Sequence, residues 1–343
     1  MMEDERFGRK AGKALCMLWY VLLFLLPGCE RRELTYYMES EVTITADWGY
    51  ANLDYENNFG STAVFYPTDG STPRVVLMGD RCRETARLPV GTYDVVLFNR
   101  SFDDFGSVAF KGYEAFNSFE AYSLKVETRA EGETVDDRII ITSPPERIAA
   151  DTIRNFCVTE DMLGNYDDGN TAAARSETAC KLHFTPQEIT RTLHVKVHIK
   201  GVKNIKSAMC TLSGVSASLF LCRKKAGDVT VAQRFDMGTP RIDEGSFTDG
   251  CMESTTNVFG FDENRTHGMK ITALLVDGKT VVEQTLEQIK ITSQKTKSGS
   301  ADLYIEAEVP EVIPDVKPEG SSDSNFDADV EEWGDEINTE IPL

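Results

Sequence analysis

Positive charge is scarce in this sequence. Its 343 residues contain 36 Lys and Arg against 56 Asp and Glu, a formal net charge of −20 at pH 7. The acidic excess is concentrated at the end of the chain, where residues 306–343 hold thirteen acidic residues and the single basic residue Lys317. A protein that binds nucleic acid needs a basic surface to neutralise phosphates, so the composition argues against a nucleic-acid partner.

Motifs of catalysis and metal binding are also missing. The sequence contains no Gly-rich phosphate loop, no nucleophile elbow, no HExxH and no CxxC spacing. His194 and His198 fall in a predicted strand, where four residues span about 13 Å, too far for one shared ion. Asn165, Asp167, Asp168 and Asn170 are predicted to lie in a surface turn. A calcium site on these four residues is the alternative, although their spacing does not match a known calcium-binding loop. We therefore expect no catalytic residues, cofactor or metal, with an enzyme of unrecognised type as the alternative.

Long apolar runs are limited to one, near the start of the chain. Ala14–Leu26 carries no charge over thirteen residues and follows a segment with four basic residues. As a helix this run would be only about 20 Å long, well short of the roughly 30 Å hydrocarbon core of a membrane. The pattern is typical of a signal peptide, predicted here over residues 1–28, rather than of a transmembrane helix.

The predicted signal peptide is followed by a cysteine. Leu26-Pro27-Gly28-Cys29 resembles the lipobox of bacterial lipoproteins, in which the cysteine is acylated and becomes the first mature residue. Two or three acyl chains on Cys29 would hold a protein stably on a membrane, where a single chain gives only marginal binding. We therefore expect residues 29–40 to form a lipid tether. An ordinary signal peptide with a chance cysteine is the alternative.

Six cysteines remain once Cys16 is removed with the signal peptide and Cys29 is assigned to lipid. They are Cys82, Cys157, Cys180, Cys210, Cys222 and Cys251. An exported chain could pair them in disulfides whose connectivity the sequence cannot rank. Buried free thiols that pack as small apolar groups are the other interpretation.

Short alternating segments dominate the rest of the chain, interrupted by turn residues about every ten positions. Glu41–Ala46 alternates, Thr62–Tyr66 precedes a Pro67-Thr68-Asp69-Gly70 turn, and Asp94–Phe98 is an apolar run that ends at Asn99. This spacing predicts an all-β fold, with a first β-sandwich domain over residues 41–180. The pattern becomes irregular from Asn155 to Ala179, which places the domain boundary shortly afterwards.

A second β-sandwich domain is predicted over residues 181–309. It opens with the clearest period-two run of the chain, Thr192–Lys200, in which the odd-numbered positions are apolar and most even-numbered ones are His or Lys. Such a strand has one buried and one wet face. Further strands are predicted at Ser207–Leu212, Ser218–Cys222, Val229–Phe235, Met269–Val276, Thr280–Thr285 and Leu303–Val309.

The chain ends in an acidic linker rich in Pro and Ser, residues 310–329, and a terminal strand, residues 330–343. In the last seven residues, Ile337, Thr339, Ile341 and Leu343 share one face, as in a half-buried strand. The strand is predicted to belong to the second domain as an edge strand, where Pro342 is tolerated. Donation of this strand to a neighbouring subunit is the alternative.

A series of short motifs runs through both predicted domains. They are Cys29-Glu30-Arg31-Arg32-Glu33-Leu34, Asp47-Trp48, Phe65-Tyr66-Pro67-Thr68-Asp69-Gly70, Leu88-Pro89-Val90-Gly91-Thr92-Tyr93, Asn99, Phe119-Glu120-Ala121-Tyr122, Thr185-Pro186-Gln187 through Val202, and Thr211-Leu212-Ser213-Gly214. Together they resemble the fimbrillin-like lipoproteins of the Bacteroidales. The resemblance is closest to their minor fimbrial anchor subunits and to an uncharacterised related lipoprotein family.

The resemblance implies two transthyretin-like (Ig-like) β-sandwich domains in tandem, export to the outer membrane with lipid on Cys29, and assembly with other fimbrial subunits. Polymerising members of that family are trimmed by an arginine-directed protease after an early strand. This sequence departs from that pattern, because Glu33 to Pro73 contains no Lys or Arg. The chain is therefore expected to keep its lipid and first strand, which favours an anchor over a shaft subunit.

The sequence thus predicts a non-enzymatic, lipid-anchored, surface-exposed structural protein, an anchor or accessory subunit of a fimbria. The alternative is a stand-alone surface lipoprotein that binds glycan or another ligand. Trp48, Tyr50 and Tyr55 are the aromatic cluster that would form a ligand platform in that case. Packing in a core or along a strand explains the same residues without a ligand.

Overall fold

The computed structural model describes residues 36–53, 59–126, 140–163, 180–261, 266–295 and 301–319. Strands make up nearly all regular structure in these ranges, with three short 3-10 helices, η1 (Phe116–Ser118), η2 (Glu160–Leu163) and η3 (Val202–Asn204). The predicted all-β fold is confirmed. Cys29, Tyr55, the polar residues 165–170 and the predicted terminal strand, residues 330–343, lie outside the described residues.

The first sandwich packs a three-stranded sheet against a five-stranded sheet. The smaller sheet has the order β10 (Cys180–Phe184), β1 (Glu39–Ala46), β4 (Arg83–Pro89). The larger has the order β11 (Gln187–Glu188), β9 (Ala149–Val158), β5 (Gly91–Asn99), β2 (Ser61–Pro67), β3 (Arg74–Met78). Strand β1 follows its sequence pattern, because Val42, Ile44 and Ala46 are buried in the core between the sheets.

The larger sheet is buried on both faces. Val95 and Leu97 of β5 pack into the core of the first sandwich, whereas Val96 and Phe98 face a second core on the opposite side. A small third sheet covers that side, with the order β15 (Lys225–Ala226), β14 (Ser218–Phe220), β7 (Glu120–Ser123), β6 (Val108–Lys111). This double burial explains why β5 is a continuous apolar run rather than an alternating one.

Strand β9 extends to Val158, so the first residues of the stretch predicted to be irregular are in fact a strand. The irregularity has a local cause. Asn155 has φ +56°, its backbone N–H donates to Asp94 Oδ1 at 3.0 Å, and the β5–β9 register shifts between Tyr93 and Val95. A bulge of this kind interrupts the alternation without ending the strand.

The second sandwich packs two five-stranded sheets around a separate core. One sheet has the order β17 (Arg241–Ile242), β18 (Gly250–Val258), β12 (Arg191–Ile199), β22 (Ala301–Glu308), β21 (Ile291–Lys295). The other has the order β20 (Val281–Leu286), β19 (Met269–Leu275), β13 (Ile205–Ser216), β16 (Thr230–Asp236), β8 (Ile141–Thr142). The period-two prediction for β12 is confirmed, because its four apolar side chains are all buried in this core.

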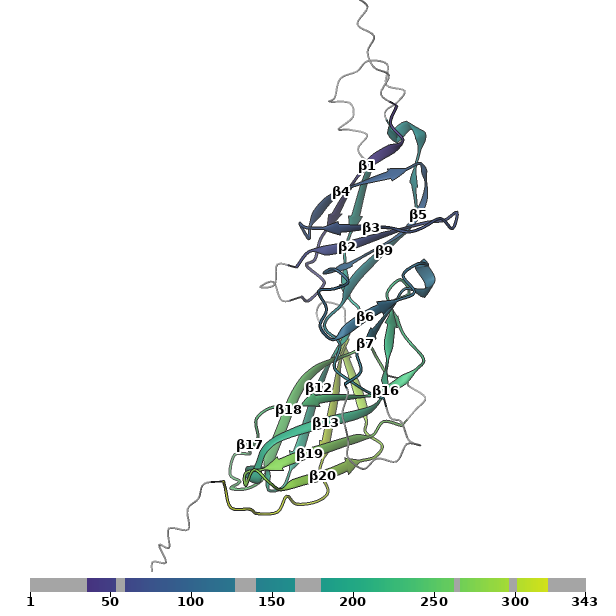
Figure 1. Ribbon diagram of the computed structural model, residues 1–343. Coiled ribbons are helices and arrows are strands. Elements are labelled where there is room, and N and C mark those ends of the chain that lie inside the picture. Colours follow the sequence, from purple (N-terminus) through teal and green to yellow (C-terminus); the bar gives the residue numbers. More distant parts are fainter. Residues whose placement is uncertain are drawn as a thin grey trace, which may run out of the picture.

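The two sandwiches lie end to end (Figure 1) and are connected by strand pairing. β14 pairs with β7 of the small sheet, and β8, which precedes β9 in the chain, pairs in parallel with β16. Leu219, Leu221 and Phe259 pack among the aromatic residues of the core under the small sheet. The two sandwiches therefore share a core and backbone hydrogen bonds in addition to the chain that connects them.

Candidate functional site

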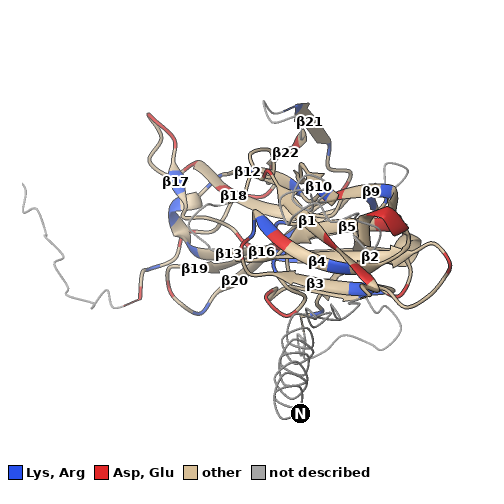
Figure 2. Ribbon diagram, turned by 90° about the horizontal axis from the view of Figure 1, so that it is seen from above, with Lys and Arg blue, Asp and Glu red and all other residues tan. Residues whose placement is uncertain are grey.

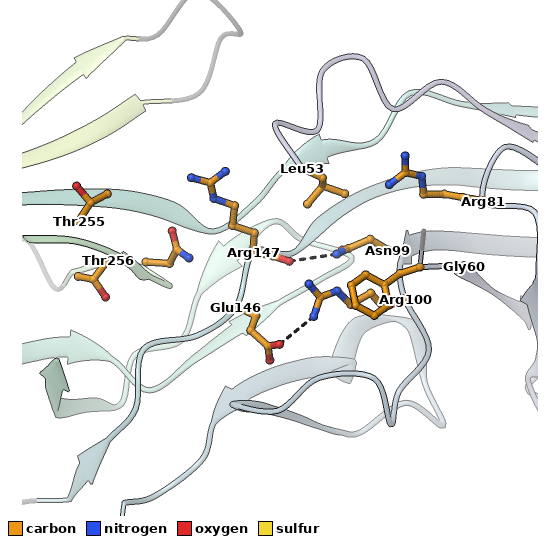
Figure 3. Close-up of a pocket in the computed structure, with 11 residues that line it drawn as sticks. Leu53, Gly60, Arg81, Asn99, Arg100, Glu146, Arg147, Thr255 and Thr256 are labelled. Carbon is orange, nitrogen blue, oxygen red and sulfur yellow. Dashed lines mark hydrogen bonds and ion pairs between the residues drawn. The ribbon is translucent and has the colours of Figure 1, made fainter. Parts of the chain in front are cut away.

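A cavity of about 300 Å³ lies at the junction of the two sandwiches (Figure 3). The first sandwich and the segment that leads into β9 supply most of the lining, and β18 supplies the rest. The lining residues are Leu53, Phe59, Gly60, Arg81, Asn99, Arg100, Glu146, Arg147, Thr255, Thr256 and Asn257.

Arg100 is the central cation of this cavity. It follows β5 with φ +67°, and its backbone N–H donates to the carbonyl of Gly60 at 2.9 Å. Its Nη1 lies 2.8 Å from Glu146 Oε1, and its guanidinium carbon lies 4.1 Å from the centre of the Phe59 ring (Figure 3). The second oxygen of Glu146 accepts a hydrogen bond from the backbone N–H of Ser107 at 2.9 Å. Both charges are therefore compensated inside the joint.

Asn99 fixes the neighbouring segment to the end of β5. Its Nδ2 donates to the carbonyl of Arg147 at 3.1 Å, and its Oδ1 accepts from the backbone N–H of Ala149 at 2.8 Å. Arg147 in turn donates from Nη1 to the carbonyl of Asn52 at 2.9 Å and lies 3.7 Å from Glu188. Burial raises the pKa of Glu188, and hydrogen bonding from Asn52 and the charge of Arg147 partly oppose that shift.

Arg100, Glu146 and Arg147 are each engaged by neighbouring groups. Arg100 pairs with Glu146, and Arg147 lies 3.7 Å from Glu188 and donates to the carbonyl of Asn52. These side-chain contacts lie within the first sandwich, and β18 lines the same cavity. The sequence motifs included Asn99 but did not predict the pairing of Arg100 with Glu146, because these two residues are 46 positions apart.

The wet face of β12 forms a second surface with β18, β22 and β21, around a hollow of about 520 Å³. His194 stacks on Tyr304 with ring centres 4.8 Å apart and lies 3.5 Å from Asp302. His198 pairs separately with Glu306 at 3.0 Å. Each histidine thus has its own carboxylate, and no group of three or more His, Cys, Asp or Glu in the described ranges is placed to hold a metal ion.

The predicted aromatic platform is divided between core and surface. Trp48 is buried in the first core, where its Nε1 donates to the carbonyl of Arg81 at 2.9 Å, whereas Tyr50 is exposed. Tyr55 lies outside the described residues. A ligand platform on these three residues stays a prediction.

All six cysteines of the body are free thiols. Cys210 and Cys251 are buried, Cys180 and Cys222 are half-buried, and Cys82 and Cys157 are exposed. Burial raises the pKa of Cys210 and of Cys222 to about 12, which keeps both thiols protonated and unreactive at neutral pH.

Within the described residues, no helix is long and apolar enough to span a membrane.

The comparisons with known proteins agree with this architecture. The chain is 21% identical over 348 residues to a candidate fimbrium anchoring subunit, Fim4B, of Bacteroides ovatus, covering 94% of this chain and 96% of that protein. A crystal structure of a candidate adhesin from the same species matches with a TM-score of 0.53 at 18% identity, over 86% of this chain and 97% of the other. The family model described as Domain of unknown function (DUF5119) matches residues 28–236. The chain therefore belongs to the DUF5119 family, and the resemblance to fimbrial proteins predicted from its motifs is confirmed.

Proposed function

We propose that this protein is a cell-surface structural subunit that anchors a fimbria to the outer membrane. One observation carries the proposal: the similarity to the Bacteroides ovatus anchoring subunit extends over 94% of this chain and 96% of that protein. A match of both chains over nearly their whole length supports a shared role better than a single shared domain would. The core and the strand pairing shared by the two sandwiches suit a part that must transmit force along a filament.

The anchor itself is assigned to lipid on Cys29. This assignment rests on the apolar run Ala14–Leu26 and on the Leu26-Pro27-Gly28-Cys29 motif that follows it. More than one acyl chain is needed to keep a protein on a membrane under load, which a lipoprotein modification supplies. The other fimbrial subunits would then attach to the body of the protein.

Replacement of Cys29 by Ser in the source bacterium tests both the lipid anchor on Cys29 and the role of the protein in holding fimbriae on the cell. We expect the variant to leave the membrane fraction and to carry filaments with it into the medium. Cys82→Ser is the matched control, since Cys82 is an exposed thiol of the body and its loss should leave both protein and filaments on the cell. A Cys29→Ser protein as membrane-bound as the parent would contradict the lipid anchor. Filaments retained at parental numbers after release of the protein would contradict the anchoring role.

A further inference from the structure

Three exposed apolar side chains belong to two neighbouring segments at one end of the protein. Tyr36, Met38 and Val90 are 64%, 70% and 45% exposed, respectively. They come from two segments brought together by strand pairing. β1 and β4 run antiparallel, and Met38 and Val90 directly flank the last pair of that ladder, Glu39 and Pro89. These three residues are called the apolar end below.

The apolar end lies opposite the second sandwich. In Figure 1, β1 and β4 are at the top of the molecule, whereas β17 and β19 are near its lower end. The turn between β4 and β5 and the start of β1 therefore lie at the end of the first sandwich that is farther from the second. Exposed apolar side chains grouped in this way mark a surface that contacts something other than water.

The short segment between Cys29 and Tyr36 limits how far the apolar end can lie from a lipid on Cys29. Only six residues separate Cys29 from Tyr36. Even fully extended, that connection spans at most about 25 Å. If Cys29 carries the lipid, the apolar end is the part of the described body that is held closest to the membrane.

The charges near the apolar end favour a neutral contact over an electrostatic one. Arg74 pairs with Glu39 at 2.8 Å, and Arg87 pairs with Glu41 at 3.1 Å. Figure 2, which looks down on this end, shows acidic and basic positions interspersed along β4 rather than a basic cluster. Binding that depends on anionic lipids needs unpaired basic residues, whereas Tyr and apolar side chains enter the interfacial region of a bilayer without them.

We propose that the apolar end rests on the lipid surface, so that the protein makes a second membrane contact beside its acyl chains. This inference rests on the proposed lipid anchor at Cys29. The contact holds the first sandwich against the bilayer and directs the second sandwich away from it. Because it is apolar, it should be insensitive to salt.

Hydroxyl-radical footprinting of the full lipidated protein on phosphatidylcholine vesicles tests the contact. We expect Met38 and Tyr36 to be oxidised about threefold more slowly on vesicles than in the Cys29→Ser protein in solution, since oxidation follows exposure. Phe247, 90% exposed in the turn between β17 and β18, is the internal control and should react equally in both samples. The protection should persist at high salt.

Equal oxidation of Met38 and Tyr36 in the vesicle-bound and soluble samples would overturn the inference while leaving the anchor intact. Protection that disappears when the protein is diluted at constant lipid would also overturn it, because a second copy of the chain would then cover the residues. Failure of the protein to float with the vesicles would instead overturn the lipid anchor, and the contact with it. These three results are distinct, so the two proposals fail separately.

Discussion

Leu221 gives the sharpest test of whether the two sandwiches form one mechanical unit. It follows β14, is fully buried, and packs in the core that covers the outer face of the five-stranded sheet of the first sandwich. Its backbone N–H also donates to the carbonyl of Phe119 at 3.1 Å. Leu221→Ala leaves that hydrogen bond in place and opens a cavity, which typically destabilises a protein by about 2–5 kcal/mol.

The loss of stability caused by Leu221→Ala should be detectable in the core of the first sandwich. Trp48 is buried in the first core, and Trp333→Phe leaves it as the single tryptophan of a chain that begins at Glu30. We expect Leu221→Ala to lower the unfolding midpoint reported by Trp48 fluorescence, because Leu221 lies in the segment that joins β13 and β16 of the second sandwich and packs against the first. A loss of about 3 kcal/mol corresponds to a fall of about 5 °C if both sandwiches, about 300 residues, unfold as one unit.

The matched control is Leu77→Ala in β3 of the first sandwich, where the leucine is exposed and the change should shift the midpoint by less than about 0.5 kcal/mol. The reasoning is refuted if Leu221→Ala leaves the Trp48 midpoint at the parental value while circular dichroism shows a second transition at lower temperature. That result would mean that the sandwiches unfold independently and that the shared core contributes little to the coupling.

Three further predictions address protonation and the two ends of the chain. Burial raises the pKa of Glu188 above its ordinary value, so the folded state binds a proton more tightly than the unfolded state, and the free energy of unfolding falls as pH rises from the unfolded-state pKa to the folded-state pKa. Urea unfolding between pH 4 and pH 7 should show a smaller pH dependence for Glu188→Gln than for the parent, and an unchanged slope would contradict this prediction. Mass spectrometry of protein isolated from cells should find Glu33 to Pro73 still joined to the start at Cys29, because the segment has no Lys or Arg; a new N-terminus before Arg100 would indicate a polymerising subunit. Deletion of Asp335–Leu343 should lower the melting temperature if the terminal strand is intrinsic, or abolish subunit association at unchanged melting if it is donated; no change in either would mean that the segment is a tail with neither role.

The strands that the sequence predicted well are those with a single buried face. β12 shows the full alternation, and β1 shows it over Val42, Ile44 and Ala46. β18 was missed because its outward positions include Glu253, Thr255 and Asn257 and its inward ones include Gly250, Ser254 and Thr256, so the apolar period is weak. Its place beside β12 is set by pairing across more than 50 residues, which local patterns do not encode.

Local sequence patterns also could not predict which sheets pack on one another, because the packed strands are distant in the sequence. The apolar run of β5 predicted a buried strand, but the small sheet that covers its second face includes β14 and β15, more than 100 residues away. The joint at Arg100, Asn99 and Glu146 arises only once those strands have paired. The motif at Cys29, by contrast, is contiguous and could be recognised without any fold.

Mass spectrometry of the complex isolated from membranes tests the central claim most directly. The protein would be purified from detergent-solubilised outer membranes with an antibody to its second sandwich, and its N-terminal peptide and co-purifying proteins identified in the same sample. The account predicts a peptide that begins at Cys29 and carries acyl chains, together with subunits of a fimbria. An unmodified Cys29, or a sample without any fimbrial subunit, would contradict it.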